Sequence, residues 1–503
     1  MSPSSLRSTL VLLCSCAALS ACAQPRQLTI LHVNDMHTHY LPEPAEWVKE
    51  DPKPLTGGMV ALQEAVAREK AGASATLVLD AGDWLTGTPL SEVEAEGVKG
   101  GAFIQMMNRV GFDAATIGNH DFDNGVETLP KLIGLASFPV VSANLRRDGE
   151  LLAPAPWLVL ERGGLKIGVV GLILDDLAQE VSREMMRGIE VRPVAETARE
   201  AIAELDPQTD LIVLLTHQGW REDSLLATQL TGADVIIGGH SHTRLKTPQL
   251  VNGVLVAQAG SSARDLGRLD LTVEDDRVTA HEGRLIPLFQ RDVKNPDPEL
   301  AALVKTHEER IDAEYAVVIG HAATDFGRNY YKESALGDLM SDLLLGITGA
   351  DVALLNSGGL RADLKSGPVS RLDIKQILPF ANTIVLFRAT GAELLTLLRT
   401  NAKASLHEEQ GILQLAGIRC AYREGAAGVE ILEPTVAGQP LDPGAVYTVA
   451  TVDYVLGLGA KYMGFEPAAH ESRSGTLFTA VAEWIAAHPE LEAPAGGRFT
   501  HRP

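Results

Sequence analysis

The sequence Leu28-Thr29-Ile30-Leu31-His32-Val33-Asn34-Asp35-Met36-His37 is a short apolar run that ends in an aspartate and a histidine. A run of this length, rich in aliphatic residues and bounded by polar ones, predicts a buried β-strand. Carboxylates and imidazoles are the ligand types that divalent transition metals prefer in proteins. The stretch therefore predicts a strand of an α/β domain with candidate metal ligands at its carboxyl end.

The same pattern returns four times downstream, where other apolar runs end in short polar motifs. The motifs are Gly82-Asp83, Gly118-Asn119-His120-Asp121, Thr216-His217 and Gly239-His240-Ser241-His242. In open α/β sheets ligands bind at the carboxyl ends of the strands, so loops that are distant in sequence can converge there. Each motif alone is compatible with an ordinary turn. Together they supply the bridging carboxylate and the nitrogen and oxygen ligands that a two-metal centre needs.

Strand-like and helix-like segments alternate along the first half of the chain, as in layered α/β proteins. Helices are predicted over 59–70 and 194–204, and the whole domain is predicted to span residues 27–291. A polar stretch with two prolines and a charged amphipathic helix then form a predicted linker over 292–316. Residues 317–503 are long enough for a second domain, with a helix from Ser334 to about Leu345 and a strand over 352–355.

Composition narrows the class of protein and of partner. The 503 residues are 45% hydrophobic and 21% charged, which is typical of a globular protein rather than a disordered chain. The 65 acidic and 43 basic side chains give a net charge of −22, which would repel a polymeric nucleic acid. A small anionic substrate is still compatible with this charge, because bound metal ions dominate the field of a site locally.

Residues 1–22 predict a secretory signal peptide, because they carry one charge, Arg7, and an apolar run from Leu10 to Leu19. Leu19-Ser20-Ala21-Cys22 resembles the bacterial lipobox, in which the cysteine is lipidated and becomes the N-terminus. Ordinary cleavage near this point is the alternative. The protein is therefore expected to be exported to the periplasm or the cell surface, with a lipid on Cys22 as its membrane contact.

The ordered series of motifs resembles the calcineurin-like metallophosphoesterases, and within them the secreted 5′-nucleotidase family. Residues 30–37 and Gly118-Asn119-His120-Asp121-Phe122-Asp123 are near-matches to that family's signatures. The resemblance covers nearly all of the chain after the signal peptide. It implies an N-terminal four-layer α/β/β/α metallophosphoesterase domain, followed by a second α/β domain that binds the substrate.

The resemblance also implies a role for each motif residue in a dinuclear centre. One divalent ion would be held by Asp35, His37 and His242, the other by Asn119, His217 and His240, and Asp83 would bridge them. His120 and Asp123 resemble the family's catalytic dyad, in which the imidazole stabilises developing charge and the aspartate orients it. A metal-activated water would attack phosphorus. This mixed ligand set suits zinc, manganese, iron or cobalt.

In the second domain the resemblance is partial. Asn356 and Arg361 match the family's base or ribose contact and its phosphate contact, and Phe380 and Tyr454 match the two aromatic rings on either side of the nucleobase. Two positions depart from the pattern. Ala460 stands where relatives have an aspartate, and Tyr330 stands where they have an arginine, for which the nearby Arg328 could substitute.

The resulting hypothesis is a secreted phosphohydrolase that releases phosphate from 5′-nucleotides, an activity of nucleotide catabolism. The alternatives are a nucleotide-sugar diphosphatase, a 2′,3′-cyclic phosphodiesterase, another small phosphate-ester hydrolase or a non-catalytic nucleotide-binding surface protein. A sulfur-compound hydrolase of the same fold is a weaker alternative. The resemblance further implies that the second domain rotates relative to the first.

Overall fold

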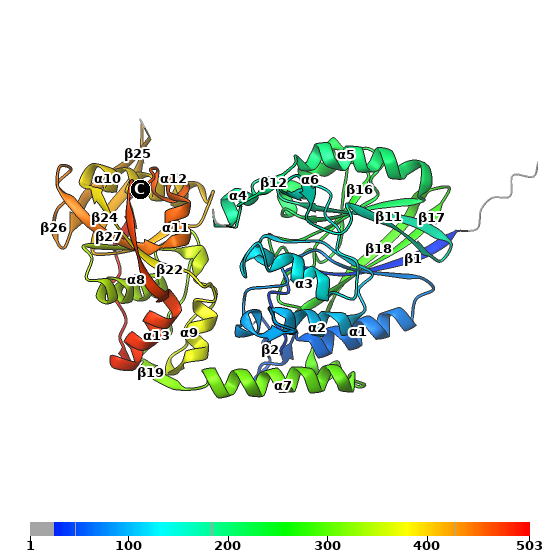
Figure 1. Cartoon of the computed structure of the whole chain (residues 1–503), viewed down its shortest axis with the longest axis horizontal. Coiled ribbons are helices and arrows are strands. Elements are labelled where there is room, and N and C mark those ends of the chain that lie inside the picture. The colour runs from blue at the N-terminus through cyan, green and yellow to red at the C-terminus, as the bar shows by residue number, and fades with distance from the viewer. Residues whose placement is uncertain (1–24, 46, 183–184, 427, 503) are drawn as a thin grey trace, which may run out of the picture.

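The computed structural model describes residues 25–502 apart from residues 46, 183, 184 and 427. The predicted signal peptide and Cys22 lie outside the described residues. Figure 1 shows two lobes, an N-terminal lobe from β1 (Arg26–Val33) to β18 (Arg277–Pro287) and a C-terminal lobe from β19 (Val318–Ala322) to β30 (Phe499–His501). Among the described residues, no helix combines the length and the apolar character that crossing a bilayer requires.

Two sheets form the interior of the N-terminal lobe. Their strand orders are β18-β17-β1-β4-β7 and β10-β11-β13-β14-β16-β15. Parallel pairing joins β1, β4 and β7 in the first sheet and β11, β13, β14 and β16 in the second. The strand bounds are β4 (Thr76–Asp80), β7 (Ala114–Ala115), β10 (Trp157–Arg162), β11 (Leu165–Ile173), β13 (Leu211–His217), β14 (Val235–Gly238), β15 (Gln249–Val251), β16 (Val254–Ala257) and β17 (Asp265–Glu274).

The strand predicted from the first apolar run is β1, and strands also lead into the other four polar motifs, as predicted. Because the parallel strands of each sheet point the same way, their carboxyl ends share one edge, and the polar motifs begin there.

The two sheets pack face to face, and helices cover their outer faces. Leu28 and Ile30 of β1 are fully buried against residues of the second sheet such as Ile167 and Val213. The first sheet is covered by α1 (Met59–Ala71), α2 (Gly101–Val110) and α3 (Leu129–Leu135), and the second by α5 (Val194–Leu205) and α6 (Trp220–Gln229). Strands buried on both faces explain why their sequences are continuous apolar runs. The predicted four-layer α/β/β/α arrangement is confirmed.

The C-terminal lobe is also mixed α/β, with a five-stranded sheet of order β23-β20-β27-β22-β28. Its α8 begins after Ser334, whose hydroxyl accepts the Gly337 N–H (3.1 Å) as an N-cap, so the predicted start is confirmed. The helix continues to Thr348, three residues past the predicted end. The bounds are α8 (Ala335–Thr348), β20 (Val352–Asn356), β22 (Thr383–Thr390), α10 (Gly391–His407), β23 (Leu413–Ala416), β24 (Ile418–Gly425), β25 (Gly428–Val436), β27 (Val446–Val452), α11 (Asp453–Gly457), α12 (Gly459–Met463), β28 (His470–Thr476) and α13 (Leu477–Ala487).

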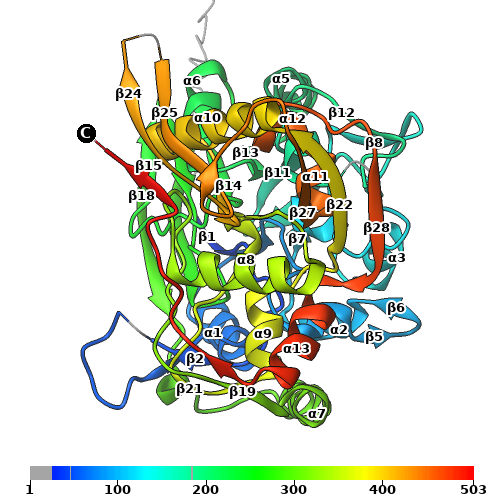
Figure 2. The ribbon, with the colours of Figure 1, turned by 90° about the vertical axis from the view of Figure 1, so that its left-hand side faces the viewer.

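The helix α7 (Pro298–Tyr315) connects the lobes, close to the predicted amphipathic helix over 299–316. It packs against α1 and α2 of the N-terminal lobe and against α9 (Arg371–Ile377) of the C-terminal lobe, as Figure 2 shows from the side. Nearby, the buried Lys375 Nζ lies 2.7 Å from Glu92 Oε1 across the boundary. The lobes are thus tied together on the α7 side.

Candidate active site

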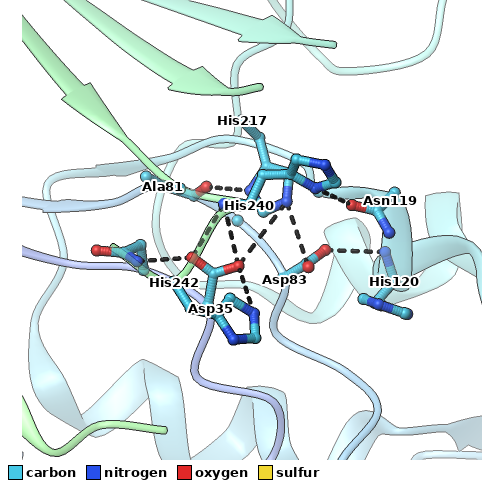
Figure 3. A network of polar contacts seen from close by, with 12 residues as sticks. Asp35, Ala81, Asp83, Asn119, His120, His217, His240 and His242 are labelled. Atoms are coloured by element: carbon cyan, nitrogen blue, oxygen red, sulfur yellow. Dashed lines mark hydrogen bonds and ion pairs between the residues drawn. The ribbon is translucent and has the colours of Figure 1, made fainter. Parts of the chain in front are cut away.

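The carboxyl ends of β1, β4, β7, β13 and β14, with the loops that follow them, bring the seven predicted metal ligands to one edge of the two sheets. Figure 3 labels six of these ligands: Asp35, Asp83, Asn119, His217, His240 and His242. Two groups of ligand atoms are each compact enough to hold a cation. One group is Asp35, His37 and His242, and the other is Asp35, Asp83 and His217, with the ligand atoms of each group within 4.8 Å of one another.

Asp35 is shared by both groups, and Asp83, a member of the second, also lies near the first. Asp83 Oδ2 lies 3.2 Å from His217 Nε2 and 3.8 Å from His37 Nε2. On the His37 side, His37 Nε2 and His242 Nε2 are 3.0 Å apart, and His242 Nε2 is 3.4 Å from Asp35 Oδ1. Two imidazole nitrogens that face each other so closely suit a shared cation. Asp83 fits the bridging position that the motifs predict.

Asn119 and His240 meet beside His217. Asn119 Oδ1 and His240 Nδ1 are 2.9 Å apart, and the rings of His217 and His240 are 5.4 Å apart between centroids. The backbone N–H of His240 also donates to the Asp35 carboxylate, at 3.0 and 3.1 Å to its two oxygens. The structure thus brings Asn119 and His240 next to His217, and these are the three residues that the resemblance assigns to the second ion.

Backbone carbonyls orient two of the imidazoles. His217 Nδ1–H donates to the carbonyl of Ala81 (2.7 Å), and His37 Nδ1–H donates to the carbonyl of Leu85 (2.9 Å). A carbonyl only accepts, so each Nδ1 carries the hydrogen and each Nε2 is directed inward as a ligand atom. His217 Nε2 is buried without a hydrogen-bond partner among the described residues. This inward orphan nitrogen fits a metal ion.

Strained backbone geometry aims the ligands. Five of them have positive φ: Asp35 (51°), His37 (49°), Asp83 (59°), His240 (74°) and His242 (53°). Residues with a Cβ avoid this region at a cost of about 1 to 3 kcal/mol each, and such residues gather at functional sites. The surrounding loops impose these conformations.

The loops that carry Asp83 and Asn119 touch each other through two glycines. A Cβ on Gly118 would lie 2.2 Å from Asp83 Oδ1, and a Cβ on Gly82 would lie 2.7 Å from the backbone nitrogen of Gly118. Gly82 also has φ +87°. Any larger side chain at either position would push the two ligand loops apart.

Asp121 is a positioning residue that the sequence reasoning missed. Its buried carboxylate accepts the N–H groups of Gly118 (2.8 Å), Trp84 (2.8 Å), Asp83 (3.2 Å) and Leu85 (3.2 Å). It therefore fastens the loop after β4 to the loop after β7. Its place inside the motif over 118–123 was the available signal, but a sequence does not show which backbone amides a carboxylate will meet.

The electrostatics of the buried centre favour the cationic form of the His217 ring, with a hydrogen on both nitrogens. Burial disfavours the charged ring, but the attraction of Asp83 and Asp35 outweighs it and raises the pKa of His217 to about 10. Burial likewise opposes ionisation of Asp83, yet His217, His120 and His37 hold the pKa of that carboxyl well below its usual range. Burial lowers the pKa of His240 to about 4. His240 is therefore neutral and ready to coordinate at pH 7.

Metal binding at pH 7 is expected to release about one proton from His217, because the metal-free ring is protonated below a pKa of about 10 and a cation needs its Nε2 lone pair. Calorimetric titration of the chelator-stripped protein with zinc, in two buffers of different protonation enthalpy, measures this release. The substitution His217→Gln is expected to lower the number of protons released. A binding heat that does not depend on the buffer would contradict the assignment.

The predicted dyad forms at the edge of the centre. His120 Nδ1 donates to Asp123 Oδ2 (2.8 Å), which also accepts the Thr86 hydroxyl (2.6 Å). Burial lowers the pKa of His120, but Asp123 and Asp83 together raise it above the ordinary value. These carboxylates thus favour the cationic form of the ring beside the metal ligands, which suits stabilisation of negative charge on a reacting group.

A cavity of about 330 Å³ opens beside His120, between the two lobes. All four predicted substrate residues line it: Asn356, Arg361, Phe380 and Tyr454. The Phe380 ring stacks on the His120 ring, with centroids 5.6 Å apart and planes 28° apart. The cavity therefore joins the candidate metal centre to the C-terminal lobe and has the size of a small-molecule site.

One of the two departures from the family pattern, Tyr330, falls at this cavity, whereas Ala460 is not among the described residues that line it. Tyr330 lines it, together with Tyr462 and Glu180, which the sequence reasoning did not select. Arg328, the suggested substitute, donates through Nη1 to the carbonyl of Leu360 (3.1 Å). Burial and the nearby Arg361 lower the pKa of Arg328. Its guanidinium is thus close to Arg361 but directed to the protein backbone.

Comparisons with known proteins agree with these observations. A calcineurin-like phosphoesterase family model matches residues 28–244, and a 5′-nucleotidase C-terminal domain model matches residues 318–466. The protein UshA of Escherichia coli K12 is 28% identical over 485 residues, 85% of each chain. A 5′-nucleotidase of Vibrio vulnificus is 28% identical over 474 residues, 81% of this chain and 83% of its own. The crystal structure of a 5′-nucleotidase precursor from Thermus thermophilus is 28% identical with a TM-score of 0.84, over 95% of this chain and all of that one. The predicted resemblance is confirmed.

Proposed function

Because this chain belongs to the 5′-nucleotidase family of the calcineurin-like metallophosphoesterases, we propose that it hydrolyses 5′-nucleotides to release phosphate. The observation that carries this proposal is the convergence of the predicted ligand side chains beside a cavity that is lined by Asn119, His120 and Arg361. A phosphate ester placed there would contact cations on both sides. Its organic part would extend between the aromatic side chains of the C-terminal lobe.

The residues present suit two divalent ions, zinc, manganese, iron or cobalt by ligand type. Asp35, His37 and His242 would hold one ion, Asn119, His217 and His240 the other, and Asp83 would bridge them. When bound, such ions lower the pKa of a coordinated water and neutralise charge on phosphoryl oxygens.

The chain's own residues supply the remaining steps. His120, whose cationic form Asp123 favours, stabilises charge that develops on the phosphoryl group or on the leaving oxygen. The Arg361 guanidinium orients the phosphate by charge-assisted hydrogen bonds. Phe380 and Tyr454 would stack against the base.

Arg361→Ala is expected to raise KM for AMP by about 10- to 100-fold, because it removes a charge-assisted contact to phosphate that is made in the ground state. Steady-state kinetics with AMP measure the change. Arg423→Ala, which breaks an exposed ion pair with Glu430 in the same lobe, is the matched control and should leave KM unaltered. An Arg361→Ala protein with an ordinary KM would remove Arg361 from the phosphate site.

A different specificity is the second candidate, since Tyr330 and Ala460 change the pocket relative to the family pattern. Nucleotide-sugar diphosphatase, 2′,3′-cyclic phosphodiesterase and general phosphatase activities all use the same metal chemistry. A non-catalytic nucleotide-binding role would leave the complete ligand set without a purpose. These possibilities separate by assay.

The test is phosphate release by the purified protein without its first 22 residues, stripped with chelator and reloaded with manganese, zinc or cobalt. The substrates are AMP, UDP-glucose, a 2′,3′-cyclic nucleotide and an aryl phosphate, with a coupled phosphatase to reveal products that free no phosphate. Metal-dependent preference for AMP supports the nucleotidase proposal. Activity on UDP-glucose or the aryl phosphate alone would replace it, and no activity would favour the binding protein.

Export and lipid attachment at Cys22 complete the proposal. They are supported by the apolar run over 10–19 and the lipobox-like sequence ahead of Cys22. A small phosphorylated substrate is then the expected partner, and the membrane would be contacted only through the lipid.

A further inference from the structure

One wall of the cavity is closed by a contact between the two lobes. Glu180 is the last residue of α4 (Leu177–Glu180), a single helical turn that projects from the N-terminal lobe toward α11 and α12 (Figure 1). Lys461 of α12 lies opposite, with Nζ 3.0 Å from Glu180 Oε1, and also donates to the carbonyl of Gln179 (2.9 Å). The pair holds α4 against the C-terminal lobe.

The Glu180 carboxylate faces the cavity among aromatic side chains. It lines the cavity together with Tyr330, Tyr454 and Tyr462. Burial is the main cause of the raised pKa values of Tyr330 and Tyr454, and the charge of Glu180 adds to both, so these rings lie within its field. The side chain of Glu180 is 32% exposed, and among the described residues no hydrogen bond uses its Oε2. Within the described part of the chain, Glu180 Oε2 is therefore an acceptor that a ligand can use.

A carboxylate can only accept hydrogen bonds, and it repels phosphate. Arg361 and His120 line the same cavity and would attract the phosphate, so Glu180, which repels it, suits an uncharged, donor-bearing part of the substrate. Lys461 is the countercharge that keeps a carboxylate tolerable in a site for an anion.

We propose that Glu180 is a specificity-determining residue, which accepts a hydrogen bond from a hydroxyl or amino group on the nucleoside part of the substrate and is held in position by Lys461. This inference rests on the proposed nucleotidase function. It assigns recognition of the nucleoside to a residue of the metal-bearing lobe, in addition to the C-terminal lobe.

The first test is Glu180→Leu in the full chain, which removes both acceptor oxygens and keeps the bulk. The measured quantity is the ratio of kcat/KM for AMP to kcat/KM for p-nitrophenyl phosphate, which lacks a nucleoside. We expect the ratio to fall by about 10- to 100-fold, the usual effect of a hydrogen bond to a charged group. Glu430→Leu, which removes a carboxylate from an exposed ion pair with Arg423, is the matched control and should not change the ratio. Melting temperatures of Glu180→Leu and of the more conservative Glu180→Gln show whether a lower ratio reflects a folding defect.

A charge swap separates recognition from simple closure of the cavity. Glu180→Lys with Lys461→Glu restores an ion pair between the lobes but moves the carboxylate to position 461, outside the cavity lining. If Glu180 accepts a hydrogen bond from the substrate, the ratio stays low in the swapped protein. Recovery of the wild-type ratio would overturn the inference and leave only a latch between the lobes.

Substrate analogues identify the donor. 2′,3′-Dideoxy-AMP lacks the ribose hydroxyls, and IMP lacks the exocyclic amino group. The analogue without the true donor should lose kcat/KM with the wild-type protein and show no further loss with Glu180→Leu. The inference would be overturned if Glu180→Leu lowered kcat/KM further for both analogues, or if its AMP to p-nitrophenyl phosphate ratio were unchanged. The nucleotidase function would stand in either case. Absence of AMP hydrolysis by the wild-type protein would instead overturn the function, and the inference with it.

Discussion

Replacing His120 with asparagine is expected to lower kcat for AMP by about 10²- to 10⁴-fold, the usual contribution of a positioned acid–base or charge-stabilising side chain. Metal content should change little, because the hydrogen bond of His120 to the centre is made by its backbone N–H, which donates to Asp83 Oδ1 (2.8 Å), while its ring packs edge to face against the His37 ring. KM should change little, since the stabilisation arises in the transition state. Steady-state kinetics and elemental analysis of the same preparation give all three quantities. An unchanged kcat would exclude His120 from catalysis.

Asp123→Asn gives a graded version of this experiment. Asp123 is one of the charges that raise the pKa of His120, so its removal lowers that pKa. Because the cationic ring is the active form, activity would be lost at lower pH than in the wild-type protein. The alkaline limb of the pH profile of kcat is therefore expected to shift to lower pH, and kcat at low pH should change less. A shift in the opposite direction would mean that the neutral ring is active.

Replacing Asp83 with alanine is expected to have the largest effect of any single change, with loss of bound metal and a fall in kcat/KM of more than about 10³-fold. Asp83 Oδ2 lies between the ligand nitrogens of both groups, so its removal weakens both proposed metal sites at once. It also leaves the buried His217 proton without its main countercharge. Mass spectrometry of metals and phosphate-release kinetics measure the two effects.

The matched control is Asp113→Asn, in the same lobe. Asp113 accepts the Val78 N–H (2.8 Å) and pairs with Arg162, away from the metal ligands. It should retain two ions per chain and nearly full activity even if the melting temperature falls. Retention of both ions by Asp83→Ala would show that Asp83 is not the bridge.

The apolar strands and the ligand motifs at their ends could be read from the sequence because each depends on local pattern. Leu28 to Val33 is a continuous apolar run because it is buried on both faces, and the parallel strand ends meet at one edge whatever the intervening loops contain. The dyad was implied by the family resemblance, and the structure joins His120 and Asp123, which lie three residues apart in one turn.

Residues that act across long distances in the sequence could not be predicted in this way. The role of Asp121 depends on the path of the loop after β4, and the role of Glu180 depends on how the lobes meet at Lys461, 281 residues later. No local period encodes either contact. The stacking of Phe380 on His120 likewise follows from the arrangement of the lobes rather than from either segment.

The left-handed backbone at Asp35, His37, Asp83, His240 and His242 has a consequence for how the enzyme matures. These conformations disfavour the ordered loops in a metal-free chain, and bound ions would offset that cost, so ion capture and loop ordering are coupled. A chain exported in an unfolded state would meet its ions only at its destination. Because the ligands suit several metals, the supply of ions in the compartment where the loops order would select the metal that the enzyme carries.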